Sequence, residues 1–205
     1  MNDMTAVTET GQDRKAPGRP RNAQADEAIL DAVLELMSDG SSVAAMSIEA
    51  VAAKAGVGKA TIYRRWPNKE ALLMDAVKSM KGALPEPEGK SVRDDLVMLV
   101  RANRTGRARR YGKVTACLLP ELLKDDGLNN MYQAALEPRR DVMRSVLRRG
   151  IENGELRPDL DIEFTLLMIQ GPSMMSNMMR STAGHIPDDE FPEVLVDAIL
   201  RGAAA

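Results

Sequence analysis

Cationic and hydrogen-bonding side chains lie four residues apart in the stretch KATIYRR. Lys59 and Tyr63 share one side of a short expected helix, with Arg64 beside them. The opposite side carries Ile62 and Trp66, which can be buried together. A slim, cationic helix surface that donates hydrogen bonds is suited to the DNA major groove, where side chains reach phosphates and base edges. The stretch therefore predicts a DNA-recognition helix.

A second short helix and a turn must hold this recognition helix, which is expected at about residues 58–65. The preceding helix begins after Ser47, a good N-cap residue, and its apolar positions recur at helical spacing as far as Ala55. Gly56 follows where the chain needs a left-handed residue to leave that helix. Pro67 ends the recognition helix. Two helices joined in this way form a helix-turn-helix.

Two further helices are expected to frame this motif. Apolar residues at helical spacing predict a bracing helix over about residues 23–39, with an acidic outer surface that phosphates repel. Asn68 can cap a fourth helix, which runs to about residue 81. Trp66 is expected in the core between these helices, and a base-stacking platform is the less favoured alternative. The DNA-binding domain is thus predicted to span residues 23–81.

Residues 1–22 form a separate segment with no apolar periodicity and with several Gly and Pro residues, which predicts a disordered arm. Its stretch RKAPGRPR is compactly basic and includes Arg19 and Arg21. A basic arm beside a helix-turn-helix can enter the minor groove or lie along phosphates. A solvated tail is the alternative.

The run SIEAVAAKAGVGKATIYRRWPNKEALL resembles the tetracycline-repressor (TetR) family of bacterial transcription regulators. The resemblance implies an all-α homodimeric repressor, with an N-terminal three-helix DNA-binding domain and a larger C-terminal helical ligand-binding and dimerisation domain. Where the family often has Ser at the cap of the recognition helix, this chain has Gly58, so one possible hydroxyl contact to phosphate is absent. With the arm and the first cap included, the predicted DNA-binding residues are Ser47, Lys59, Ala60, Thr61, Tyr63, Arg64, Arg65, Lys69, Arg19 and Arg21.

A linker, GALPEPEGK at residues 82–90, opens the second domain, which is predicted to span residues 82–205. Beyond the linker there is neither strand alternation nor a Gly-rich phosphate loop. Pro120 predicts a kink or break within its helix, and Pro138 raises the same expectation in the next one. Pro172 is expected to bend the helix that contains it. The helices are expected at about residues 91–104, 107–123, 128–153, 162–181 and 189–201.

The helix expected at residues 162–181 is apolar on more than one side, so it must be covered on more than one side. In a dimer of the family, a pocket or core would cover one flank and the partner subunit the other. The last helix supplies the second arm of such an interface. The predicted dimer-interface residues are Ile162, Leu166, Ile169, Val194, Leu195, Ala198 and Ile199.

Methionine is abundant, with 14 residues, whereas only 3% of the chain is aromatic. Flexible thioethers can line a cavity for varied apolar ligands, although simple core filling is the alternative for each methionine. The family resemblance, and not the spacing, implies that a pocket for an unknown small apolar ligand exists. The candidate ligand-binding residues are Leu99, Asn103, Cys117, Met131, Met143, Met168, Gly171 and Met175.

A second basic cluster contains Arg101, Arg104, Arg107, Arg109 and Arg110. It could hold an anionic ligand or add long-range attraction to DNA. A solvated helix end is the more common outcome for such a cluster and is favoured here.

Single copies of cysteine and histidine exclude several kinds of site. Cys117 alone allows neither an intrachain disulfide nor a thiolate metal cluster, and His185 alone cannot build a multi-histidine zinc site. We therefore expect no metal, no cofactor and no catalytic residue. No signal peptide and no membrane-spanning apolar run is evident, which predicts a cytoplasmic protein that binds double-stranded DNA and no membrane.

The sequence leaves three functions to compare. A ligand-released DNA-binding repressor is the leading hypothesis, and a DNA-binding regulator controlled by a protein partner, or by nothing, is the alternative. An enzyme for small apolar substrates has no nucleophile–base pair, metal spacing or cofactor loop to support it. A ligand-sized cavity among the C-terminal helices would favour the first hypothesis, and a filled core there would favour the second.

Overall fold

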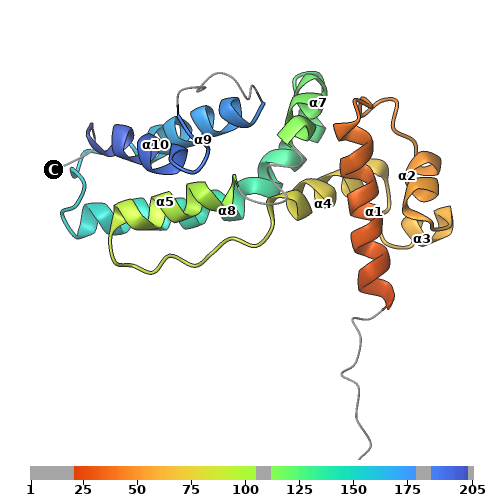
Figure 1. The fold of residues 1–205 in the computed structure, drawn as a ribbon, viewed down its shortest axis with the longest axis horizontal. Coiled ribbons are helices and arrows are strands. Elements are labelled where there is room, and N and C mark those ends of the chain that lie inside the picture. The colour runs from red at the N-terminus through yellow and green to blue at the C-terminus, as the bar shows by residue number, and fades with distance from the viewer. Residues whose placement is uncertain (1–20, 105–111, 179–185, 203–205) are drawn as a thin grey trace, which may run out of the picture.

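A computed structural model describes residues 21–104, 112–178 and 186–202 of the 205-residue chain, and Figure 1 shows its course. The described residues form helices, as the all-α prediction requires, and their connections contain no strand. The helices are α1 (Arg21–Ser38), α2 (Ile48–Ala55), α3 (Lys59–Tyr63), α4 (Lys69–Lys81), α5 (Val92–Ala102), α7 (Gly112–Leu122), α8 (Asp126–Glu152), α9 (Ile162–Met178) and α10 (Phe191–Leu200).

Local capping explains where the N-terminal helices begin and end. The Ser47 side chain accepts a hydrogen bond from the backbone N–H of Ala50 at 3.1 Å, and Asn68 accepts one from Ala71 at 2.8 Å. Gly56 is left-handed, with φ 67° and ψ 33°, and its N–H reaches the last carbonyl groups of α2. These contacts confirm the predicted caps and the predicted turn between α2 and α3.

One hydrophobic core joins α1, α2, α3 and α4 to α7 and the start of α8. Ile62 of α3 is fully buried, and Trp66 is only 6% exposed with its Nε1 donating to Asp75 at 3.0 Å. Trp66 is therefore a core residue, as predicted. Val114 and Leu118 of α7 complete the same core, so its packing extends beyond the boundary expected at residue 82.

A second core joins α5, α8, α9 and α10. Its members include Leu96 of α5, Leu147 of α8 and Ile169 of α9. Gly150 allows α8 to approach the start of α5, because a Cβ atom added there would lie 2.5 Å from Cγ2 of Val92. The second core thus fixes the C-terminal helices as one packed unit.

The connection between α4 and α5 is held by a buried carboxylate. Asp95 is 2% exposed and accepts hydrogen bonds from the backbone N–H of Glu88 at 2.8 Å and of Gly89 at 3.1 Å. Nη2 of Arg149 lies 2.5 Å from the same carboxylate. Asp95 therefore ties the connection to both α5 and α8.

Proline does not break the C-terminal helices. Pro120, Pro138 and Pro172 lie inside α7, α8 and α9, and each helix continues through its proline. Of the kink or break expected at Pro120 and Pro138, the break does not occur, and the bend expected at Pro172 stays a prediction. A proline removes one backbone hydrogen bond, but tertiary packing of the flanking turns outweighs that local cost. Leu118 and Leu122, on both sides of Pro120, are buried in the first core.

The molecule is elongated, with α2 and α3 at one end and α5, α9 and α10 toward the other (Figure 1). α4 leads from the helix-turn-helix toward the C-terminal helices, and α7 lies beside α1. None of the helices in the described ranges has the length and apolar content needed to cross a membrane.

Candidate DNA-binding surface and ligand cavity

The outer surface of α3 is open to solvent. Tyr63 is 54% exposed, and Ala60 and Arg64 are exposed beside it, while Ile62 anchors the opposite side in the core. Thr61 is half-buried at the edge of this surface. We name the exposed residues Lys59, Ala60, Tyr63 and Arg64 the α3 ridge. The ridge lies at the end of the molecule farthest from α10, so the C-terminal helices leave it uncovered (Figure 1).

Lys59, at the start of the α3 ridge, is paired in the free protein. Its Nζ lies 2.6 Å from Oε1 of Glu49 on α2, and both side chains are largely exposed. The hydrogen bond raises the pKa of Lys59 and lowers that of Glu49. An exposed ion pair of this kind is weak, so a phosphate can replace the carboxylate at small cost.

Arg65 faces inward, which corrects the prediction that it presents its charge to DNA. Its guanidinium pairs with Asp26 of α1 and donates from Nη1 to the carbonyl oxygen of Thr61 at 3.0 Å. Only 14% of the side chain is exposed. Arg65 therefore fixes α3 against α1 and positions the ridge.

Lys69 is likewise engaged by the protein, although phosphate was its predicted partner. Its Nζ donates to the carbonyl oxygens of Val43 at 2.9 Å and Met46 at 3.4 Å, in the connection before α2. Ser47 next to that connection uses its hydroxyl as the α2 cap. Residues 21–22, predicted to end the disordered arm, begin α1, so Arg21 is helical. The rest of the predicted arm, with Arg19, lies outside the described residues.

The turn before α3 gives a prediction on stability. Gly56→Ala should lower the free energy of unfolding by about 1–2 kcal/mol, because a Cβ atom is strained in the left-handed conformation. Gly58→Ser is the matched control, since Gly58 has an ordinary extended backbone with φ −77° and open space around it. The control should change stability by less than about 0.5 kcal/mol. Urea denaturation of the three proteins measures both effects, and equal losses would contradict the assigned turn.

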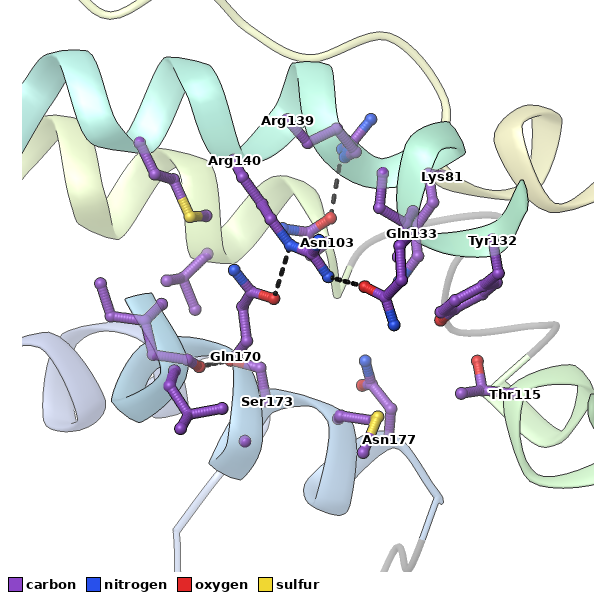
Figure 2. A pocket seen from close by; sticks show the side chains of 17 residues that line it. Lys81, Asn103, Thr115, Tyr132, Gln133, Arg139, Arg140, Gln170, Ser173 and Asn177 are labelled. Carbon is purple, nitrogen blue, oxygen red and sulfur yellow. Dashed lines mark hydrogen bonds between the residues drawn. The ribbon is translucent and has the colours of Figure 1, made fainter. Parts of the chain in front are cut away.

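A cavity of about 230 Å³ lies among α4, α5, α7, α8 and α9. Figure 2 shows polar side chains of α8 and α9 pointing toward each other across it. Of the candidate ligand-binding residues, Asn103, Met143 and Gly171 line this cavity.

The other five candidates lie elsewhere, which corrects the expectation of a methionine-lined pocket. Leu99 is fully buried in the second core, and the thiol of Cys117 donates to the carbonyl oxygen of Met37 at 3.2 Å, facing α1. Met131 and Met175 are 39% and 43% exposed and do not line the cavity. Met168, half-buried on α9, does not line it either. The methionines here serve packing and surface more than ligand contact.

Most of the cavity-lining residues that were not predicted from the sequence are polar or cationic. Tyr132, Leu136, Arg139 and Met143 follow one another at spacings of four, three and four residues, so they share one side of α8 and all line the cavity. This periodicity could have indicated the cavity-lining side of α8 from the sequence alone. A side of a long helix that mixes polar and apolar residues is, however, usually a solvated surface. The missed lining residues with polar side chains are Lys81, Thr115, Tyr132, Gln133, Arg139, Arg140, Gln170, Ser173 and Asn177.

Arg140 is held in a network at one wall of the cavity (Figure 2). It donates to the side-chain oxygens of Gln133 at 2.5 Å and Gln170 at 3.3 Å. Its third contact is an ion pair with Glu137 at 3.2 Å. The charge of Arg140 is therefore already compensated within α8.

Lys81 and Arg139 are less well compensated. Burial and the nearby charge of Arg139 lower the pKa of Lys81 to about 8. Burial also lowers the pKa of Arg139 and raises that of Tyr132. All three shifts indicate a desolvated site that disfavours the charged form of each group.

Lys81 should make stability depend on pH in a specific way. Its folded pKa of about 8 lies below the ordinary 10.5, so the unfolded chain binds more protons between these values and stability rises with pH there. Lys81→Met removes the buried charge and should raise the free energy of unfolding at pH 7 by about 1–3 kcal/mol. The difference in the free energy of unfolding between the variant and the wild type should shrink as pH rises from 8 to 10. Denaturation at pH 7 and pH 10 measures it, and a gap independent of pH would contradict the assignment.

The predicted dimer-interface residues divide into three groups. Leu166 and Ile169 are 2% and 1% exposed inside the second core, so their side chains support α9 and do not reach a partner. Burial on the α5–α8 side is the physical reason for this correction. Ile162, Leu195 and Ile199 are half-buried at the edge of that core, whereas Val194 and Ala198 are exposed.

Exposed apolar surface on α9 comes instead from residues outside that prediction. Phe164 is 58% exposed, and Leu167, which also lines the cavity, is 64% exposed. Val194 of α10, the helix that packs against α9, is 42% exposed. Large exposed side chains of this kind are typical of a surface that another chain covers.

The described part of the second basic cluster holds α10 in place. Arg101 pairs with Glu193, and Arg104 lies 3.0 Å from a carboxylate oxygen of Asp188 and over the ring of Phe191. The rest of the cluster, at residues 107–110, lies outside the described residues. Across the described ranges, no cluster of three or more acidic, cysteine or histidine side chains is arranged to hold a metal ion.

Comparisons with known proteins agree with this architecture. The description "Bacterial regulatory proteins, tetR family" matches residues 29–76, and "Tetracyclin repressor-like, C-terminal domain" matches residues 86–199. The chain is 36% identical over 193 residues to YdeS, an HTH-type transcriptional regulator of Bacillus subtilis, with 92% of this chain and 94% of the relative covered.

A repressor and a solved structure are also similar. The DNA-binding transcriptional repressor TetR of Mycobacteroides abscessus is 29% identical over 162 residues, which cover 75% of this chain and 80% of that protein. The crystal structure of the transcriptional regulator FadR from Bacillus subtilis, in complex with stearoyl-CoA, matches with a TM-score of 0.69 and 18% identity over 86% of this chain and 98% of that one. The last match shows a shared fold. With both halves of the chain matched and the helix-turn-helix exposed at one end, the protein belongs to the TetR family of DNA-binding transcriptional regulators.

Proposed function

We propose that the protein is a ligand-responsive transcriptional repressor that binds a palindromic operator as a homodimer. The observation that carries the proposal is the α3 ridge, which is exposed on one side and anchored by Ile62 on the other. Tyr63 and Arg64 are the exposed groups able to reach phosphates or base edges, and Lys59 joins them once it leaves Glu49. Arg65 and Lys69 act indirectly, by fixing the angle of α3.

Homodimer formation is proposed through α9 and α10. Phe164 of α9 and Val194 and Ala198 of α10 supply exposed apolar surface. These two helices lie toward the end of the molecule opposite α3 (Figure 1). A twofold axis there would leave both ridges free to enter successive major grooves. Residues 23–81 would then serve DNA binding and residues 82–205 ligand binding and dimerisation.

Response to a small ligand is proposed to act through the cavity. The presence of the cavity favours a ligand-responsive regulator over one without an inducer. Lys81 lines the cavity and is also the last residue of α4, whose first turn follows the recognition helix. A ligand that binds more tightly to one position of α4 shifts the population of the dimer between DNA-binding and released forms. The FadR neighbour is seen with stearoyl-CoA, which supports ligand binding in this architecture.

Selection from random duplex DNA tests the proposal. The purified full-length chain should enrich an inverted repeat whose half-site centres lie about 10–10.5 base pairs apart, or a multiple of that. Light scattering of the same preparation should give the mass of a dimer. Enrichment of a single half-site by a monomer, or no enrichment at all, would contradict the proposed function.

A further inference from the structure

Two cationic side chains that line the cavity, Arg139 and Lys81, have no carboxylate partner among the described residues. Among the described arginines, the half-buried ones otherwise pair with Asp or Glu, as Arg65 does with Asp26 and Arg149 with Asp95. Arg139 donates only to neutral acceptors, the carbonyl oxygen of Gly82 at 2.9 Å and Oδ1 of Asn103 at 3.1 Å. Its Nε is buried and without a hydrogen-bond partner among the described residues.

Lys81 is the second such group. Lys54, Lys59, Lys78 and Lys90 each pair with a carboxylate, and the half-buried Lys69 donates to two backbone carbonyl oxygens. Lys81 has neither an ion pair nor a hydrogen bond within the described part of the chain. It faces Arg139 and shares the cavity wall with it. Two desolvated positive charges that lack a counterion destabilise a protein, and an anion bound between them would offset that cost.

The remaining cavity wall defines the rest of the occupant. The described lining contains no Asp or Glu side chain, so nothing there repels a negative charge. Amide groups of Asn103, Gln133 and Gln170 offer hydrogen bonds. Apolar side chains, including the largely exposed Leu167 and Met174, line the rest. A volume of about 230 Å³ suits a compact molecule with both a charged and an apolar part.

We propose that the cavity takes a small amphipathic carboxylate, with its negative charge between Lys81 and Arg139 and its apolar part toward Leu167 and Met174. This proposal rests on the ligand-responsive function above and replaces the apolar ligand expected from the sequence. Because Lys81 ends α4, the negative charge of the ligand acts directly on the helix that leads to the DNA-binding motif. The charge of the ligand is then the feature that the regulator senses.

Isothermal titration calorimetry with matched probes tests the charge. Octanoate should bind at least about tenfold more tightly than 1-octanol, which has the same chain and no charge, and octylammonium should not bind. Inorganic phosphate, which lacks an apolar part, should bind more weakly than octanoate. Equal affinity for octanoate and 1-octanol, or equal affinity for octanoate and phosphate, would overturn the proposal.

Variants then locate the charge. Lys81→Met should abolish most of the preference for octanoate over 1-octanol, while Lys78→Met, on the exposed side of α4 and paired with Asp75, should leave the preference unchanged. Thermal unfolding establishes that both variants are folded. An unchanged preference in Lys81→Met would overturn the proposal.

Proton uptake provides a readout that a merely structural role for Lys81 would not produce. At pH 8.5 a bound carboxylate should raise the pKa of Lys81, so binding takes up a proton and the observed enthalpy depends on the buffer. The other titratable or charged groups of the lining are Tyr132, Arg139 and Arg140. The dependence should vanish in Lys81→Met. A buffer-independent enthalpy in the wild type would contradict the proposed contact.

Two outcomes separate this proposal from the proposed function. Octanoate binding without release of the selected operator DNA would leave the carboxylate site standing and contradict the ligand response. Release of the operator by 1-octanol, without octanoate binding, would contradict the carboxylate site and leave the ligand response standing. A gel-shift assay with each probe distinguishes them.

Discussion

Replacing Tyr63 and Arg64 together with alanine lowers the affinity for operator DNA by about a hundredfold or more, with the free energy of unfolding changed by less than about 0.5 kcal/mol. Both side chains are exposed on the α3 ridge, and neither has an ion-pair partner among the described residues. Each direct contact to a base or phosphate contributes about 1–3 kcal/mol to binding. Fluorescence anisotropy on the selected operator measures the affinity.

The neighbouring arginine supplies the matched control for that result. Arg65→Ala removes an inward-facing guanidinium that holds Asp26 and the Thr61 carbonyl, so the variant should lose about 1–3 kcal/mol of stability. In Arg64→Ala the salt dependence of operator binding should also weaken, because one cationic contact is gone. If Arg64→Ala destabilised the fold and Arg65→Ala did not, the assigned orientations of the two side chains would be wrong.

Replacing Asp95 with alanine is expected to cost about 3–5 kcal/mol of stability, a large share of what a protein of this size has to lose. The carboxylate is 2% exposed and satisfies two backbone N–H groups as well as Arg149. Its removal leaves all of these donors without their partner in a desolvated site. Guanidinium denaturation measures the loss.

A nearby exposed pair provides the comparison. Lys90 and Glu88 lie 2.7 Å apart with 75% and 61% of their side chains exposed. Lys90→Ala should change the free energy of unfolding by less than about 0.5 kcal/mol, because solvent screens an exposed pair. A loss in Asp95→Ala no larger than that in Lys90→Ala would show that the connection between α4 and α5 is not held by the buried carboxylate.

The helix-turn-helix was predictable because several local signals agree over a short stretch. Ser47 and Asn68 cap helices, Gly56 supplies the left-handed turn, and the apolar spacing of α2 and α4 matches their buried sides. These signals depend on near neighbours in the chain. The predicted helix positions in the second domain were also close to the observed ones, because strong apolar periodicity indicates a helix even where the sequence contains a proline.

Side-chain direction was not predictable in the same way. Arg64 and Arg65 are adjacent and identical in type, yet one faces solvent and the other pairs with Asp26, which is distant in the chain. Lys69 was predicted to meet phosphate, but carbonyl groups before α2 are within its reach. Such assignments depend on the tertiary packing of α1 against the motif, which no local pattern reports.

The cavity was only partly predictable for a related reason. The abundance of methionine pointed to an apolar pocket, whereas the lining combines α4, α5, α7, α8 and α9 and is rich in polar groups. Lys81 belongs to the end of the DNA-binding helices in sequence but lines the cavity in space. Only the packing of α4 against α8 reveals that connection.

Hydroxyl-radical footprinting of the full-length protein on its selected operator tests the central claim most directly. Two exposed ridges on one dimer should protect two patches related by twofold symmetry, centred about 34–36 Å apart or a multiple of that. The protection should disappear in the Tyr63→Ala, Arg64→Ala double variant. A single protected patch, or protection that persists in that variant, would show that the α3 ridge is not the surface that binds DNA.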